Sequence, residues 1–68
     1  MNINDIVSLL VKRDGISENE ARNLIINCRE DIYEALSGEN LYGVYETICD
    51  IVADWLGLEP DYIDIILE

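Results

Sequence analysis

The chain has 68 residues, half of them hydrophobic, and carries 15 acidic against 4 basic residues and no histidine, for a net charge of -11. This length allows one domain, and the many aliphatic side chains exclude a disordered acidic tail. Because imidazole, the usual general base, is missing and cations are few, we expect neither an enzyme nor direct binding to nucleic acid.

The net negative charge comes entirely from the later part of the chain. Residues 1–29 hold all four basic residues and four of the acids, so the remaining 11 of the 15 acids fall in residues 30–68, without a single base. Such one-sided charge opposes compaction, and it attracts cationic surfaces while repelling anionic ones.

A first helix is expected over residues 5–13, because apolar side chains recur there at three- and four-residue spacing. Asn2 or Asn4 can cap its start, and Asp14-Gly15 ends it. Its last turn carries Lys12-Arg13, where the helix dipole favours cations. The side chains expected on its buried face are Ile6, Leu9 and Leu10.

The second helix has the clearest start signal. Ser17-Glu18-Asn19-Glu20 is a capping box, in which Ser17 accepts from the backbone of Glu20 and the Glu20 side chain reaches back. The helix is expected to run to Leu36 and to stop at Ser37-Gly38. Glu18 and Arg22 can pair at i,i+4 spacing. The residues expected on its buried stripe are Ala21, Leu24, Ile25, Cys28, Ile32, Ala35 and Leu36.

A third helix is expected over residues 40–56, with Gly57 as its stop. Gly43 falls in its first turn, where it is tolerated or permits a close helix contact. The residues expected on its buried side are Leu41, Val44, Tyr45, Ile48, Val52, Trp55 and Leu56.

A short fourth helix is expected to begin at Pro60, with Leu58 and Ile63 packed across the turn. Residues 62–67 are apolar on nearly every side, so this helix must be enclosed by its own bundle or by a second subunit. We therefore predict an all-α single domain over residues 1–68. It is expected to be a small bundle of three main helices plus a short C-terminal fourth helix, and to form a homodimer through that helix and its neighbours.

Cys28 and Cys49 are expected to be buried free thiols, because two cysteines without histidine make neither a disulfide scaffold nor a zinc site. The N-terminus lacks the basic and apolar regions of a signal peptide, and no stretch reaches the ~20 apolar residues of a membrane span. We expect a cytoplasmic protein with no cofactor, no metal and no membrane contact.

Acids recur at helical spacing in the third and fourth expected helices. Successive carboxylates at i, i+4 and i+8 lie about 6 Å apart along a helix axis, which is similar to the phosphate spacing of one nucleic-acid strand. They form either an anionic contact surface for a basic cleft or a solvated face that keeps a hydrophobic protein in solution. A neighbouring tyrosine is either an aromatic anchor or a residue at the core edge. The residues predicted to contact a partner are Glu46, Asp50, Asp54, Asp61, Asp64 and Tyr62.

Three segments carry a resemblance to a group of proteins. They are Gly15-Ile-Ser-x-x-Glu-Ala-x-x-Leu24, Cys28-Arg-Glu-x-x-Tyr33-Glu-Ala-Leu36 and Leu56-Gly-Leu-Glu-Pro-Asp-Tyr62. Together they resemble very small acidic helical proteins encoded by bacteriophages and prophages, which often inhibit host enzymes or defence nucleases. The resemblance implies a non-catalytic inhibitor that binds a host protein with a basic surface, and it carries over no functional residue. The alternative is a homodimeric assembly module that makes its contacts with apolar helical surface.

Overall fold

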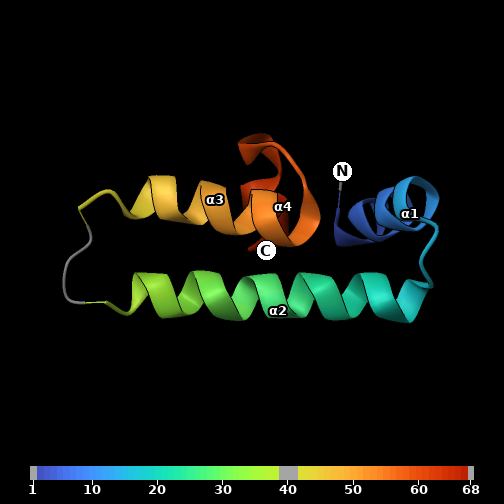
Figure 1. Ribbon diagram of the computed structural model, residues 1–68, viewed down its shortest axis with the longest axis horizontal. Helices are drawn as coiled ribbons and strands as arrows, with labels where there is room; N and C mark the ends of the chain where they lie inside the picture. Colours follow the sequence, from blue (N-terminus) through green and yellow to red (C-terminus); the bar gives the residue numbers. More distant parts are fainter. Residues whose placement is uncertain (1, 39–41, 68) are drawn as a thin grey trace.

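The computed structural model describes residues 2–38 and 42–67 of the chain, and helices account for most of them (Figure 1). The described segments contain no strand, so the all-α prediction is confirmed. No described helix has the length and apolar content needed to cross a membrane. The elements in chain order are α1 (Ile3–Asp14), α2 (Glu18–Leu36), α3 (Val44–Leu56), the 3-10 helix η1 (Pro60–Tyr62) and α4 (Ile63–Ile66).

The longest helix, α2, lies along one side of the molecule, with α1, α3 and α4 on the other side (Figure 1). The Glu20 backbone N–H donates to Ser17 Oγ over 3.1 Å, which confirms the predicted N-cap. The return bond from the Glu20 side chain does not occur among the described residues. The α2 residues buried in the structure are Ala21, Ile25, Cys28 and Ile32.

Leu36 was predicted to be buried, and this is wrong, because its side chain is 41% exposed. Leu36 is the last residue of α2, and Figure 1 shows that this end of the helix lies at the tip of the α2–α3 hairpin. Helical spacing identifies the correct face of α2, but it does not indicate how far along the helix the neighbouring elements extend.

The first helix begins at Ile3, two residues before its predicted start, because Asn2 caps it. The Asn2 Oδ1 atom accepts from the backbone N–H of Asn4 at 2.9 Å, and the Asp5 carboxylate accepts from the Asn2 N–H at 2.8 Å. At the other end Gly15 has φ 67°, a left-handed conformation that suits glycine, so the predicted stop is confirmed. The α1 residues buried in the structure are Ile6, Val7 and Leu10, and Leu9 is half-buried.

The third helix begins at Val44, so its predicted start near residue 40 is wrong. Gly43 precedes the helix with φ 73°, a conformation that other residues rarely adopt. A helix cannot continue through this left-handed residue, which explains the later start. Residues 40 and 41 lie outside the described residues. Gly57, with φ 63°, ends α3 as predicted.

Two aromatic residues of α3 are more exposed than predicted. Tyr45 is 63% exposed and Trp55 is 37% exposed, whereas Ile48, Val52 and Leu56 form the buried face. The Trp55 indole Nε1 donates to the Asp31 carboxylate of α2. Trp55 therefore lies at the edge of the interface between α2 and α3 and not in the core.

The apolar fourth helix is partly enclosed by its own chain. Ile63 and Ile66 are buried together with Leu58, and Ile65 and Leu67 are half-buried against the same core. This matches one of the two predicted ways to cover the helix, namely enclosure by the rest of the fold.

The two cysteines are free thiols, and they differ in burial. Cys28 is fully buried in the core, whereas Cys49 is half-buried. Burial of the Cys28 thiol, with a smaller effect of the nearby Asp31 carboxylate, raises its pKa to about 11.

We expect Cys49 to react with a soluble disulfide reagent well before Cys28. At pH 8 a thiol with a pKa of about 11 is ionised to only about one part in a thousand, and Cys28 is also inaccessible. Mass spectrometry of the labelled chain measures the order of modification. In a Cys49→Ser variant, labelling of Cys28 should become fast only when urea unfolds the protein. Rapid labelling of Cys28 without denaturant would contradict the burial of this residue.

Candidate functional site

The acidic stripe, Glu46, Asp50 and Asp54, lies on α3 and is exposed at every position. These residues repeat every four positions on the side of the helix away from its buried face. Asp61 in η1 and Asp64 in α4 are exposed as well. All five predicted acidic site residues therefore face solvent.

The fold brings the acids of η1 and α4 close to one flank of α3. The pKa of Tyr45 is raised by the neighbouring Cys49 thiol, by burial and, to a smaller extent, by the Asp61 and Asp64 carboxylates. Tyr45 precedes Glu46 directly in α3, and Asp61 and Asp64 lie within electrostatic range of its hydroxyl. The structure thus places an exposed aromatic side chain within electrostatic range of two of the predicted acids.

Tyr62, the predicted aromatic anchor, is half-buried and packs against the hydrophobic core. Tyr45 is the more exposed of the two, and we had assigned it to the buried side of its helix. Its place near the start of the helix was the available signal for its exposure. Helical spacing did not reveal this exposure, because Tyr45 lies on the same side of α3 as Ile48 and Val52 but in the first turn of the helix.

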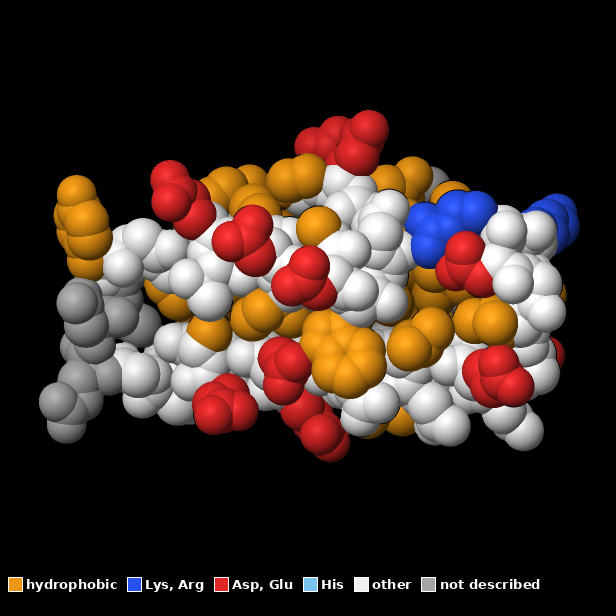
Figure 2. Space-filling model, viewed as in Figure 1, with side chains coloured by type: hydrophobic (Ala, Val, Ile, Leu, Met, Phe, Trp, Pro, Cys, Tyr) orange, Lys and Arg blue, Asp and Glu red, His pale blue; other side chains and the backbone are white. Residues whose placement is uncertain are grey.

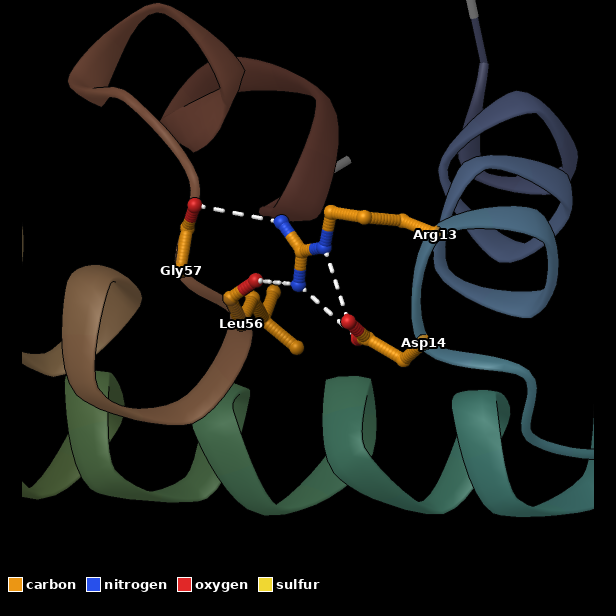
Figure 3. Close-up of polar contacts among 4 residues, drawn as sticks. All are labelled: Arg13, Asp14, Leu56 and Gly57. Carbon is orange, nitrogen blue, oxygen red and sulfur yellow. Dashed lines mark hydrogen bonds and ion pairs between the residues drawn. The ribbon is translucent and has the colours of Figure 1, made fainter.

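The three arginines of the chain form bonds within the fold. The Arg13 guanidinium donates to the carbonyl oxygens of Leu56 and Gly57 at the end of α3, and to the carboxylate of Asp14 (Figure 3). The sequence placed Arg13 correctly in the last turn of α1, but it did not indicate that its bonds reach across to α3. The Asp14 pairing raises the pKa of Arg13 and lowers that of Asp14.

The other two arginines connect other parts of the fold. Arg29 Nε donates to the carbonyl oxygen of Ile66 in α4. Arg22 Nη2 donates to Asn4 Oδ1 over 3.1 Å and pairs with Glu18 over 3.3 Å, as predicted for i,i+4 spacing. Within the described residues, neither the acidic stripe nor the acids of η1 and α4 form an ion pair. Their charge is therefore not neutralised by a neighbouring base.

One face of the molecule shows how the charges are distributed (Figure 2). Acidic side chains lie over α2, α3 and α4, whereas the basic side chains of this face gather toward the α1 end. A band of hydrophobic side chains separates the acids of α2 from those of α3. The anionic surface on this face is thus broad and divided, and α3 carries the most regular part of it.

This arrangement can attract a cationic partner, but the described residues form no buried polar site and no metal site. Among the described residues no polar or charged residue is buried, and no group of three acids or cysteines is placed to hold a metal ion. A hollow of about 490 Å³ is an open groove on α1, and none of the predicted site residues lines it. Comparisons with protein-family models, curated proteins and solved structures give no match.

The contacts of Arg13 predict a specific effect on stability. We expect Arg13→Met to lower the free energy of unfolding by about 1–2 kcal/mol, because it removes charge-assisted hydrogen bonds to the end of α3 from a partly exposed site. Urea unfolding followed by circular dichroism measures the change.

Lys12→Met is the matched control for Arg13→Met. It removes a cation from the same turn of α1, and no described bond joins Lys12 to α3, so the loss should stay below about 0.5 kcal/mol. Equal losses in both variants would show that the cation acts through the dipole of its own helix.

Proposed function

We propose that the protein is non-catalytic and binds a partner protein with a basic surface through the acidic stripe of α3, Asp61 and Asp64. The observation that carries the proposal is the division of charges in the fold. The arginines are bonded within the chain, while these acids are exposed and have no ion pair among the described residues. We further propose that the helices form a small bundle of three main helices with a short fourth, and that the protein acts in the cytoplasm.

Long-range attraction is the main contribution that such a surface makes to binding. Complementary potentials raise the association rate, and ion pairs at the rim of an interface mainly set orientation. Tyr45 adds an exposed aromatic side chain within electrostatic range of Asp61 and Asp64, and aromatic residues are enriched in interfaces. The proposed contact therefore combines steering by charge with a local apolar contact.

The resemblance to small acidic phage proteins supports inhibition as the outcome of binding. A cleft that binds nucleic acid is lined by lysine and arginine, and carboxylates about 6 Å apart on α3 suit such a cleft. The proposal is therefore a host-directed inhibitor, with an enzyme that handles nucleic acid or acts in defence as the class of target.

Capture from a bacterial lysate tests this proposal when it is combined with variants of defined charge. The immobilised wild-type chain is compared with the stripe variant, Glu46→Gln, Asp50→Asn and Asp54→Asn. We expect a specific protein with a basic surface to be retained at low salt by the wild type and lost by the stripe variant. Mass spectrometry identifies the retained protein, and purified components then confirm direct binding.

A second triple variant is the control for net charge. Glu20→Gln, Glu30→Gln and Glu34→Gln remove three exposed acids from α2, so both triples have a net charge of -11 + 3 = -8. The α2 variant should retain the partner. Equal retention by the stripe variant would refute the proposed surface, and equal loss by both variants would mean that total charge, and not α3, controls binding.

A further inference from the structure

A second stripe runs along α2, beside its buried face. Its five residues follow one another at alternating spacings of four and three, which is the pattern of a coiled-coil seam. The stripe contains apolar and basic side chains and no acid, although the chain as a whole is strongly acidic. The members of this α2 seam are Arg22, Ile26, Arg29, Tyr33 and Leu36.

The α2 seam is open to solvent along most of its length. Ile26 is 49% exposed, Tyr33 is 51% exposed and Leu36 is 41% exposed, so three of the largest exposed apolar side chains lie on one line. The Arg22 side chain is 44% exposed. A helix face with this composition leaves apolar area that a second helix can cover.

A hollow of about 190 Å³ lies on the α2 seam. Four α2 residues line it at positions i, i+3, i+4 and i+7, and Ile3 and Val7 of α1 line the rest. Four residues at these positions form the hole that receives one side chain of a facing helix in a coiled coil. The four α2 residues are Arg22, Ile25, Ile26 and Arg29.

We propose that the α2 seam is the interface of an antiparallel homodimer in which Leu36 of each copy enters the hollow of the other. Antiparallel pairing about a two-fold axis near Asp31 places Ile26 opposite Leu36 of the copy, and Arg29 opposite Tyr33 of the copy. The two residues of each opposed pair lie equally far before and after Asp31, as a two-fold axis at this position requires.

Charge selects the antiparallel orientation. A parallel pair would place Arg29 opposite Arg29 and Arg22 opposite Arg22, whereas the antiparallel register places the Arg29 guanidinium over the Tyr33 ring, a favourable cation–π arrangement. Arg29 Nε is already bonded to the Ile66 carbonyl, which restricts the movement of its side chain. The antiparallel copy therefore complements the seam in shape and avoids placing arginine directly opposite arginine.

The proposed dimer does not depend on the acidic stripe, because the stripe residues belong to α3 and the seam belongs to α2. The overall charge of -11 on each copy opposes association, and Glu30 borders the seam on both copies. Added salt should therefore strengthen the dimer by screening this repulsion. This is the opposite of the effect expected for binding to a basic partner.

Analytical ultracentrifugation of the full chain tests the dimer. In moderate salt the mass should rise with protein concentration from the 7.8 kDa of one chain toward twice that value. Leu36→Lys should weaken self-association about tenfold or more, because it places a cation in a hollow lined by Arg22 and Arg29. Ala53→Lys adds the same charge at an exposed position of α3 and should associate like the wild type.

Two outcomes of the sedimentation experiment would overturn the dimer. One is a wild-type mass of one chain at every concentration and salt level. The other is self-association of Leu36→Lys equal to that of the wild type, with circular dichroism confirming that both are folded. Neither outcome concerns α3, so the proposed function would still be tested separately by the stripe variant.

Disulfide trapping tests the orientation. Ile26→Cys and Leu36→Cys are made separately in a Cys49→Ser background, in which Cys28 is the only other thiol and is fully buried. Under mild oxidation a mixture of the two variants should cross-link mainly between unlike chains. Cross-linking of each variant only with itself would indicate a parallel pair and would refute the proposed register.

Discussion

Replacing Ile32 with alanine is expected to lower the free energy of unfolding by about 3 kcal/mol. Ile32 is fully buried on α2, and truncation of such a side chain removes apolar contacts and leaves a cavity. A domain of this size has a total stability of roughly 3–10 kcal/mol, so the loss is a large part of the total. Urea unfolding followed by circular dichroism should show a much lower midpoint, with part of the protein unfolded before urea is added if the stability is at the low end.

The same substitution at Ile26 provides the control. Ile26 lies on the same helix and is 49% exposed, so Ile26→Ala should change the free energy of unfolding by less than about 1 kcal/mol in the monomer. Similar losses in the two variants would contradict the orientation of α2, on which the packing of α1, α3 and α4 depends.

Neutralising the acidic stripe should slow association with the captured partner about tenfold or more. The triple change Glu46→Gln, Asp50→Asn and Asp54→Asn removes the most regular row of carboxylates and leaves the buried face of α3 intact. Steering acts over distances near the Debye length, so the association rate should fall and its salt dependence should flatten, with a smaller change in the dissociation rate. Stopped-flow mixing at several salt concentrations measures both effects.

The α2 triple, Glu20→Gln, Glu30→Gln and Glu34→Gln, separates a local effect from a global one. It has the same net charge as the stripe variant and changes a different helix. We expect it to associate at close to the wild-type rate. If both triples slow association equally, net charge governs the encounter and the stripe has no special role.

The helix ends were predictable wherever the signal is local. Gly15, Ser17 and Gly57 act through their own side chain or their own backbone conformation, so a few neighbouring residues were enough to place them, whereas Asn2 was one of two possible caps for the first helix. Gly43 shows the ambiguity of such signals. A glycine near a helix start fits both a tolerated first turn and a left-handed residue outside the helix, and the structure shows the second.

Contacts between elements were not predictable from spacing. The bonds from Arg13 to the end of α3 join residues more than forty positions apart, and nothing near Arg13 in the sequence indicates them. Tyr45 and Trp55 occupy helical positions that also suit a core, but both lie at its border. Their exposure depends on where α2 and α4 end, which is a property of the assembled fold.

The candidate site was predictable in part. Exposure of the stripe follows from the polarity of its residues and their four-residue repeat on a helix with a clear apolar side. The approach of Asp61 and Asp64 to Tyr45 depends on how η1 and α4 fold back toward α3, which no residue pattern specifies.

The salt dependence of thermal stability tests most directly whether the later part of the chain carries crowded, unneutralised negative charge. We predict that the melting temperature of the wild-type chain rises by several degrees between low and moderate NaCl, because salt screens repulsion among exposed carboxylates. The rise should be smaller for the stripe variant, measured at a concentration at which both chains are monomeric. A melting temperature that falls or stays constant over this range would contradict the account.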